Sequence, residues 1–118
     1  KNIFPEELET YLCRTPFVAE SVVVGFINPK KKDYDIVAII YPDKARMDET
    51  YGEKWTRDQL DAELRRAVAE VNGIVQSYKR IECYVIRDTE FPKNASRKIK
   101  RQGLADSVKA EYEAKMKG

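Results

Sequence analysis

Histidine is absent from the 118 residues, and there are only two cysteines. Without histidine the chain lacks the common kinds of zinc site and has no imidazole for acid–base catalysis. The two cysteines, Cys13 and Cys83, lie far apart and match no metal-ligand spacing. This usage favours two reduced, buried thiols in a cytoplasmic protein over a disulfide. We therefore predict no metal site in this chain.

Long apolar runs are also missing, so the sequence predicts no transmembrane segment and no signal peptide. Apolar residues still make up 42% of the chain, and the net charge is only +2. This balance is typical of a folded chain rather than a disordered one. A length of 118 residues favours a single domain.

Acidic residues are scarce near the C-terminus. Residues 1–90 carry 14 basic against 17 acidic residues, whereas residues 91–118 carry 8 against 3. A nucleic-acid-binding domain usually spreads positive charge over a face and has an isoelectric point above about 9. Here the value is about 8.5 and the excess lies in the last quarter, so we expect no nucleic-acid partner.

The hydrophobic pattern predicts three helices. Residues 4–14 open with Pro5 and two glutamates, which suit a first helical turn, and Pro16 ends that helix. A capping box formed by Thr56 and Gln59 begins a long amphipathic helix that ends near Gly73. A C-terminal helix is predicted from apolar residues four apart: Leu104, Val108, Tyr112 and Met116.

Three β-strands are predicted at residues 20–28, 34–42 and 80–88 from their β-branched and alternating residues. The first two flank a polar turn and should pair as a hairpin, and a charged loop should follow from Asp43 to Trp55. The order helix, strand, strand, helix, strand, basic loop, helix predicts an α+β fold. We expect a small two-layer α/β sandwich with about three strands and three helices.

The basic loop "FPKNASRKIKR" (91–101) contains five cations and no acid. It is either a patch for a polyanion or a loop that delivers one lysine to one reaction. RNA-binding surfaces interleave aromatic with basic side chains, and this loop offers only Phe91. Composition alone leaves both interpretations open.

Two stretches about ninety residues apart resemble the motifs that open and close the small C-terminal domain of adenylate-forming enzymes. "NIFPEELE" (2–9) is similar to the opening pattern of Ile, Pro and Glu-Ile-Glu. "PKNASRKIKR" (92–101) is similar to the closing motif Pro-Lys-Thr-x-Ser-Gly-Lys-Ile-x-Arg. "SYKRI" (77–81) stands before the third strand, as in that family. Within the family, "GFINPKKKDYDIVAIIYPD" (25–43) and the Arg before Lys98 most resemble bacterial long-chain fatty acid:CoA ligases.

Two residues depart from the closing motif. Asn94 replaces the usual threonine and Arg97 replaces the usual glycine. Since a side chain limits the backbone at position 97, we expect a negative φ there. The resemblance implies that residues 1–118 are the mobile C-terminal domain of an AMP-forming acyl-CoA ligase whose N-terminal domain binds ATP and the acid. We expect this domain to be inactive alone.

The family reaction joins a carboxylate to AMP from ATP and then transfers the acyl group to CoA, with Mg²⁺ bound mainly by the N-terminal domain. By position in the motif, Lys98 is the lysine that stabilises charge between carboxylate and α-phosphate in the first step. We expect Lys98 on an exposed, mobile loop. Lys93, Lys100 and Arg101 are expected to be mainly solvated surface charges.

The resemblance also implies residues for the second step, in which the domain rotates to form the CoA channel. Ile3, Pro5 and Glu7 would form the channel edge, although Pro5 and Glu7 also suit a helix start. Tyr78, Lys79 and Arg80 would contact the CoA nucleotide, or would form a solvated turn before the strand. The alternatives are the same domain from an enzyme for an aryl or amino acid, and a free-standing polyanion-binding domain.

Overall fold

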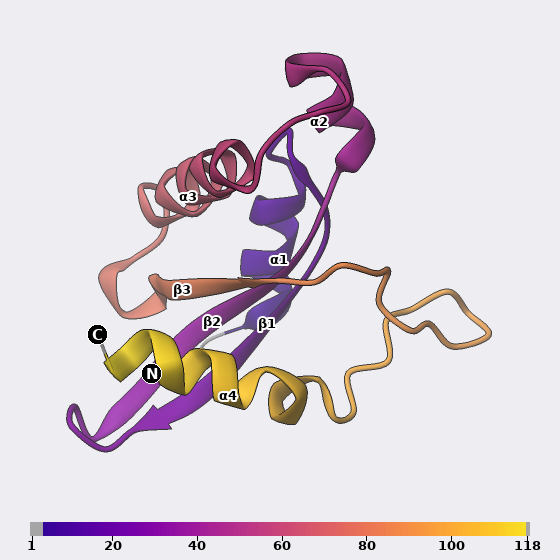
Figure 1. The fold of residues 1–118 in the computed structure, drawn as a ribbon. Coiled ribbons are helices and arrows are strands. Elements are labelled where there is room, and N and C mark those ends of the chain that lie inside the picture. Colours follow the sequence, from indigo (N-terminus) through magenta and orange to yellow (C-terminus); the bar gives the residue numbers. More distant parts are fainter. Residues whose placement is uncertain (1–3, 118) are drawn as a thin grey trace.

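The computed structural model describes residues 4–117 and contains a three-stranded sheet with helices on both faces (Figure 1). In chain order the elements are α1 (Pro5–Cys13), β1 (Val18–Asn28), β2 (Asp33–Pro42), α2 (Lys44–Tyr51), α3 (Arg57–Asn72), the short 3₁₀ helix η1 (Ser77–Lys79), β3 (Ile81–Ile86) and α4 (Leu104–Lys117). The predicted α+β class with a three-stranded sheet is confirmed. Among residues 4–117, none of the helices has the length and apolar character needed to span a bilayer.

The sheet has the order β1-β2-β3. β1 and β2 form the predicted antiparallel hairpin, and β2 pairs with β3 in parallel. A parallel pair needs a crossover connection, which here runs through α2 and α3. β3 therefore leaves the sheet at the same end as β2, and the basic loop starts from that end.

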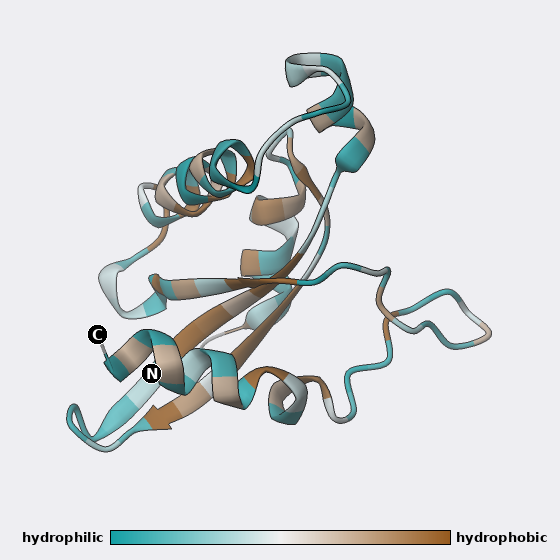
Figure 2. Cartoon of the chain, viewed as in Figure 1, coloured by the Kyte–Doolittle hydropathy of each residue, from teal (hydrophilic) through white to brown (hydrophobic). Residues whose placement is uncertain are grey.

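Two hydrophobic cores lie on opposite faces of the sheet. α1 and α3 pack on one face, and this helical layer and the sheet are the two layers of the predicted sandwich. α4 packs on the other face. β2 serves both cores, because Ile36, Ala38 and Ile40 face the first and Val37 and Ile39 face the second. This explains its unbroken apolar run, and Figure 2 shows hydrophobic residues concentrated on the strands.

The helix ends follow local chemistry. Pro5 occupies the first turn of α1, and the Thr56–Gln59 capping box begins α3 as predicted. α2 was not predicted, since residues 43–55 were expected to be a loop. It is a polar helix with only Met47 buried, so it shows no apolar period, and the Asp43 side chain caps it by accepting from the Arg46 N–H at 3.0 Å.

Two sequence-based expectations need correction. Ile81, Cys83 and Val85 were expected on one face, but Ile81 packs in the first core and Val85 in the second. The pairing of β3 with β2 shifts after Ile81, which turns the following residues over. The cysteines are free as predicted but not buried: Cys13 is exposed at the end of α1, and Cys83 is half-buried.

Candidate functional site

Residues 91–101 form a narrow hairpin that extends beyond the end of the sheet (Figure 1). Lys93 and Ile99 pair as an antiparallel bridge, and the Lys100 N–H donates to the Pro92 carbonyl at 2.8 Å. Nearer the tip, the Asn94 N–H donates to the Lys98 carbonyl at 2.9 Å. These bonds define a base at residues 91–93 and 99–101 and a tip at residues 94–98.

Asn94 organises the tip. Its side-chain oxygen accepts from the Ser96 N–H at 2.9 Å and from the Lys98 N–H at 3.0 Å. Its backbone carbonyl accepts from the Arg97 N–H at 2.9 Å. This is the local side-chain-to-backbone bonding that asparagine favours in turns. The asparagine that departs from the family motif therefore holds the backbone directly before Lys98.

The expected negative φ at Arg97 is wrong, because its φ is 64°. The chain reverses within a few residues, and the Arg97 N–H must reach back to the Asn94 carbonyl, which places Arg97 in the left-handed region. Glycine enters this region freely, whereas other residues pay about 1–2 kcal/mol. The turn thus keeps a conformation that suits the family's glycine although an arginine occupies the position.

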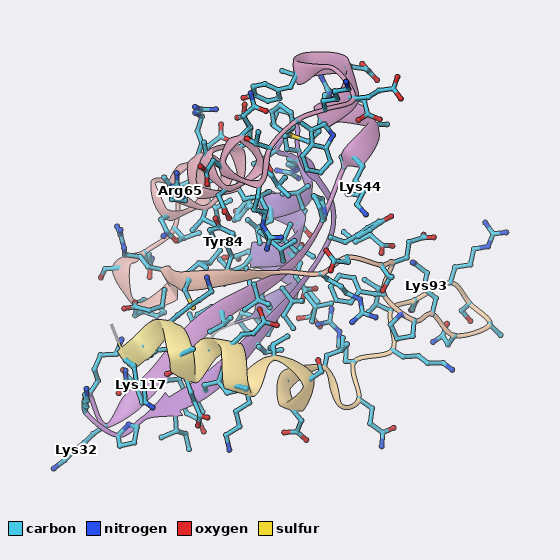
Figure 3. All side chains as sticks on the ribbon, viewed as in Figure 1. Lys32, Lys44, Arg65, Tyr84, Lys93 and Lys117 are labelled. Carbon is cyan, nitrogen blue, oxygen red and sulfur yellow. The ribbon has the colours of Figure 1, made fainter. Side chains whose placement is uncertain are left out.

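The hairpin base is anchored to the body of the domain. Phe91 is buried in the second core, and the Arg87 guanidinium lies 5.0 Å from its ring centre. Lys93 was expected to be a solvated charge, but its Nζ lies 2.6 Å from Glu20 Oε2. The hydrogen bond with Glu20 raises the pKa of Lys93. Figure 3 shows Lys93 where the loop leaves the body.

Arg101 was also expected to be solvated, and it too is paired. Its Nη2 and Nη1 donate to Glu9 Oε1 at 2.5 Å and to Glu9 Oε2 at 2.7 Å. Hydrogen bonding to Glu9 raises the pKa of Arg101. Glu9 is the last residue of the opening motif (2–9), and Arg101 is the last residue of the closing motif (92–101). This ion pair therefore connects the two motifs that carry the resemblance.

Lys98 lies on the exposed tip. Within residues 4–117, the side chains of Arg97, Lys98 and Lys100 form no ion pair. Lys98 therefore has an ammonium free to meet an external anion. Its exposure agrees with the expectation, and its mobility stays a prediction.

A second group of predicted residues lies at the start of β3. Glu7 of α1 and Lys79 of η1 form an ion pair with an N–O distance of 3.2 Å. Pro5 and Tyr78 line one groove together with residues of the β1–β2 hairpin: Val23, Val24, Gly25, Asp33, Tyr34 and Ile36. Ile3 lies outside the described residues. The fold thus brings Pro5, Glu7, Tyr78 and Lys79 together.

Arg80 lines a different groove between α3, β3 and α4. Two further cations, Arg65 and Lys115, line it as well, and the Lys115 ammonium lies 5.4 Å from the centre of the Tyr84 ring. Figure 3 labels Arg65 and Tyr84. Burial first, and then the hydrogen bond to Asp61, raises the pKa of Tyr84 to about 12. Sequence reasoning missed Arg65 and Lys115, because they lie on surface helices and in no motif.

The two groups of residues lie at opposite ends of β3. Tyr78 and Lys79 precede its first residue, and the lysine hairpin follows its last. Six residues of strand span about 20 Å. The domain therefore presents two groups of candidate residues, one at each end of this strand.

The fold and the site define a small three-stranded α+β domain with a projecting lysine hairpin. Residues 7–98 match the family described as AMP-binding enzyme C-terminal domain, and the chain belongs to that family.

One similar protein is the 4-chlorobenzoate–CoA ligase of Pseudomonas sp. (strain CBS-3), which is 31% identical over 93% of this chain and 18% of its own length. A solved o-succinylbenzoate CoA synthetase from Bacillus subtilis is 29% identical with a TM-score of 0.60 and covers 90% of this chain and 18% of its own. A fatty acyl CoA synthetase from Mycobacterium tuberculosis is 21% identical with a TM-score of 0.65, over 94% of this chain and 19% of its own, and shows the shared fold. The chain thus spans less than a fifth of each relative.

Proposed function

We propose that this chain is the C-terminal domain of an ATP-dependent, AMP-forming acid–CoA ligase and that Lys98 serves the adenylation step. The observation that carries the proposal is the unpaired Lys98 at the tip of a hairpin whose base is fixed by Phe91, Lys93 and Arg101. Such a loop can hold one charge at a set distance from the domain. Membership of the family and similarity to CoA ligases support the same conclusion.

In the adenylation step a carboxylate approaches the α-phosphate of ATP, and two anions repel each other. The Lys98 ammonium would lie between them and stabilise the negative charge that develops on the transferring group. Lysine suits this task because its charge is compact and its stem is long. ATP, the acid and Mg²⁺ would be held mainly by the N-terminal domain of the parent enzyme.

In the thioester step the domain would rotate, withdraw Lys98 and present the opposite end of β3 to the partner domain. Pro5, Glu7 and the preceding residue Ile3 would then border the CoA channel. The Tyr78 ring would stack on adenine, and Arg80 would pair with phosphate. Lys79 is already paired with Glu7, so it would position Glu7 rather than bind CoA.

Two observations bear on the carboxylic acid substrate, and they favour different classes of acid. Residues 25–43 and Arg97 resemble long-chain fatty acid:CoA ligases, which favours a fatty acid. The similar Pseudomonas protein bears the name of an aryl acid ligase, which makes an aromatic acid the second candidate. A panel of fatty and aromatic acids, tested for acid-dependent ATP–pyrophosphate exchange by the intact parent enzyme, discriminates between them.

Polyanion binding is less favoured because acids from elsewhere in the fold neutralise part of the basic loop. Glu20 pairs with Lys93 and Glu9 with Arg101, which leaves Arg97, Lys98 and Lys100. Binding of single-stranded RNA that weakens steeply with salt would favour this alternative. ATP–pyrophosphate exchange that is lost in Lys98→Ala would favour the ligase.

A further inference from the structure

Glu9 is an acidic residue in an unusual place. It lies on the inner side of α1 with only 8% of its surface exposed. Its Oε2 accepts from the Val23 N–H of β1 at 2.7 Å, and both of its oxygens accept from Arg101. A buried carboxylate is stable only when it is paired and hydrogen-bonded, and Glu9 meets both conditions.

Arg101 reaches Glu9 from a point three residues after Lys98. The two parallel N–H bonds of a guanidinium to one carboxylate fix both distance and orientation, which a single ammonium contact does not. Since Val23 belongs to the sheet, Glu9 connects the C-terminal strand of the hairpin to α1 and β1 together.

The N-terminal strand of the hairpin has a matching attachment. Glu20 of β1 binds Lys93 through one oxygen and accepts from the Phe91 N–H through the other at 3.0 Å. Ile99 lies in one groove with Glu9 and Glu20. Two carboxylates therefore hold the two strands of the hairpin base on either side of Ile99, and only the tip that carries Lys98 extends freely.

We propose that Glu9 and Arg101 are positioning residues for the lysine step: they contact no reactant and act by setting where Lys98 stands relative to the domain. This inference rests on the proposed function. A displacement of about 1 Å at a reacting group can lower a rate by about a hundredfold, so loosening the base should be visible in catalysis. The same contacts should have no effect on the rate of thioester formation, because Lys98 is withdrawn from the site in that step.

The test is Arg101→Gln in the intact parent enzyme, with Lys100→Gln as the matched control. Lys100 carries the same charge one residue earlier and forms no ion pair within the described residues. We expect Arg101→Gln to slow adenylation by about tenfold or more through kcat, with KM for ATP within about twofold and thioester formation from acyl-adenylate unchanged. Lys100→Gln should leave both half-reactions near the wild-type rates.

Three further variants sharpen the test. Arg101→Lys keeps the charge but not the two-pronged contact, so it should recover adenylation only in part. Glu9→Gln can still accept from the Val23 N–H, which makes it the alternative if Arg101→Gln does not fold, and it should show the same split between half-reactions. The double variant should be no slower than the more severe single variant, because both remove one contact.

Hydrogen exchange in the intact enzyme provides a readout of position. The Lys98 and Lys100 amides should exchange faster in Arg101→Gln, while amides of β2 stay protected. The inference is overturned if adenylation is unaffected, or if both half-reactions fall alike together with the melting temperature. If Lys98→Ala itself leaves adenylation intact, the proposed function fails and this inference fails with it.

Discussion

Arg97 illustrates how one residue can depart from a family pattern and still preserve its geometry. The sequence suggested that a side chain would force the loop into another conformation, but the backbone keeps a φ of 64°. The hydrogen bonds made by Asn94 hold the turn on both sides of this residue. Their geometry depends on the folded turn, so the residue types alone could not predict the sign of φ.

The strain at position 97 predicts a difference between two small substitutions. Arg97→Gly removes the side-chain clash of the left-handed conformation, whereas Arg97→Ala retains it. We expect the glycine variant to exceed the alanine variant by about 1 kcal/mol in free energy of unfolding, measured with urea. Equal stabilities would mean that the turn adopts a negative φ.

Identifying Lys98 depended on the motif and not on general chemistry. Five cations lie in residues 91–101, and nothing in their spacing distinguishes one from another. The structure separates them, because Lys93 and Arg101 are paired with acids 73 and 92 positions earlier in the chain. Such distant pairs follow from the fold and could not be predicted from local sequence.

At the level of elements, apolar periodicity was sufficient to predict each helix or strand that packs on a hydrophobic core. It predicted α1, α3, α4 and all three strands, since each has a buried stripe or face. It missed α2, whose one buried residue is Met47 and whose other contacts are polar, such as the hydrogen bond from Trp55 Nε1 to Asp48 Oδ1 at 2.8 Å. It also missed the shift in β3, because strict alternation hides a local change of register.

A buried polar contact joins α4 to the β1–β2 hairpin. Asp35, at 1% exposure, accepts from the Tyr112 hydroxyl at 2.6 Å and from Asn28 Nδ2 at 2.9 Å, and it contacts the Lys31 ammonium. Burial acts to raise the pKa of Asp35, but the hydrogen bonds from Lys31, Tyr112 and Asn28 outweigh it and hold the pKa below its ordinary value of 3.8. The contact therefore requires the ionised carboxylate.

This contact predicts a pH dependence. Because the pKa of Asp35 is lower in the folded state, its stabilisation is fully present above about pH 4 and is lost as the pH falls through the folded value. Asp35→Asn should lower the free energy of unfolding by about 1–3 kcal/mol at pH 7. The gap to the wild type should narrow below pH 4 in urea titrations. The exposed Asp33→Asn is the control and should have a smaller effect, and a gap that stays constant down to pH 2 would contradict the assignment.

For the whole molecule, the two candidate regions at opposite ends of β3 fit the proposed domain that works in two orientations. Lys98 and Tyr78 are both exposed, and in the proposed function the N-terminal domain holds ATP and the acid. We therefore predict that the 118 residues alone support no acid-dependent ATP–pyrophosphate exchange, measured with isotopically labelled pyrophosphate. Exchange above background by the purified chain would show that the domain contains a complete active site.

The most direct test of the proposed role uses Lys98→Ala in the intact parent enzyme, with each half-reaction measured separately. Adenylate formation should fall by on the order of 10²–10³-fold, as when one oriented charge-stabilising group is removed. Thioester formation from pre-made acyl-adenylate and CoA should stay within a few fold, because the rotated domain keeps the lysine away. Lys98→Arg should recover little, since the planar guanidinium cannot occupy the same point.

Lys100→Ala is the control for this measurement, because it removes an equal charge two residues further along the same hairpin. We expect it to leave adenylate formation close to the wild-type rate while Lys98→Ala lowers it by on the order of 10²–10³-fold. If both substitutions slow adenylation equally, the loop acts through its overall charge and the role of Lys98 is wrong. If Lys98→Ala slows both half-reactions alike, rotation of the domain between them is contradicted.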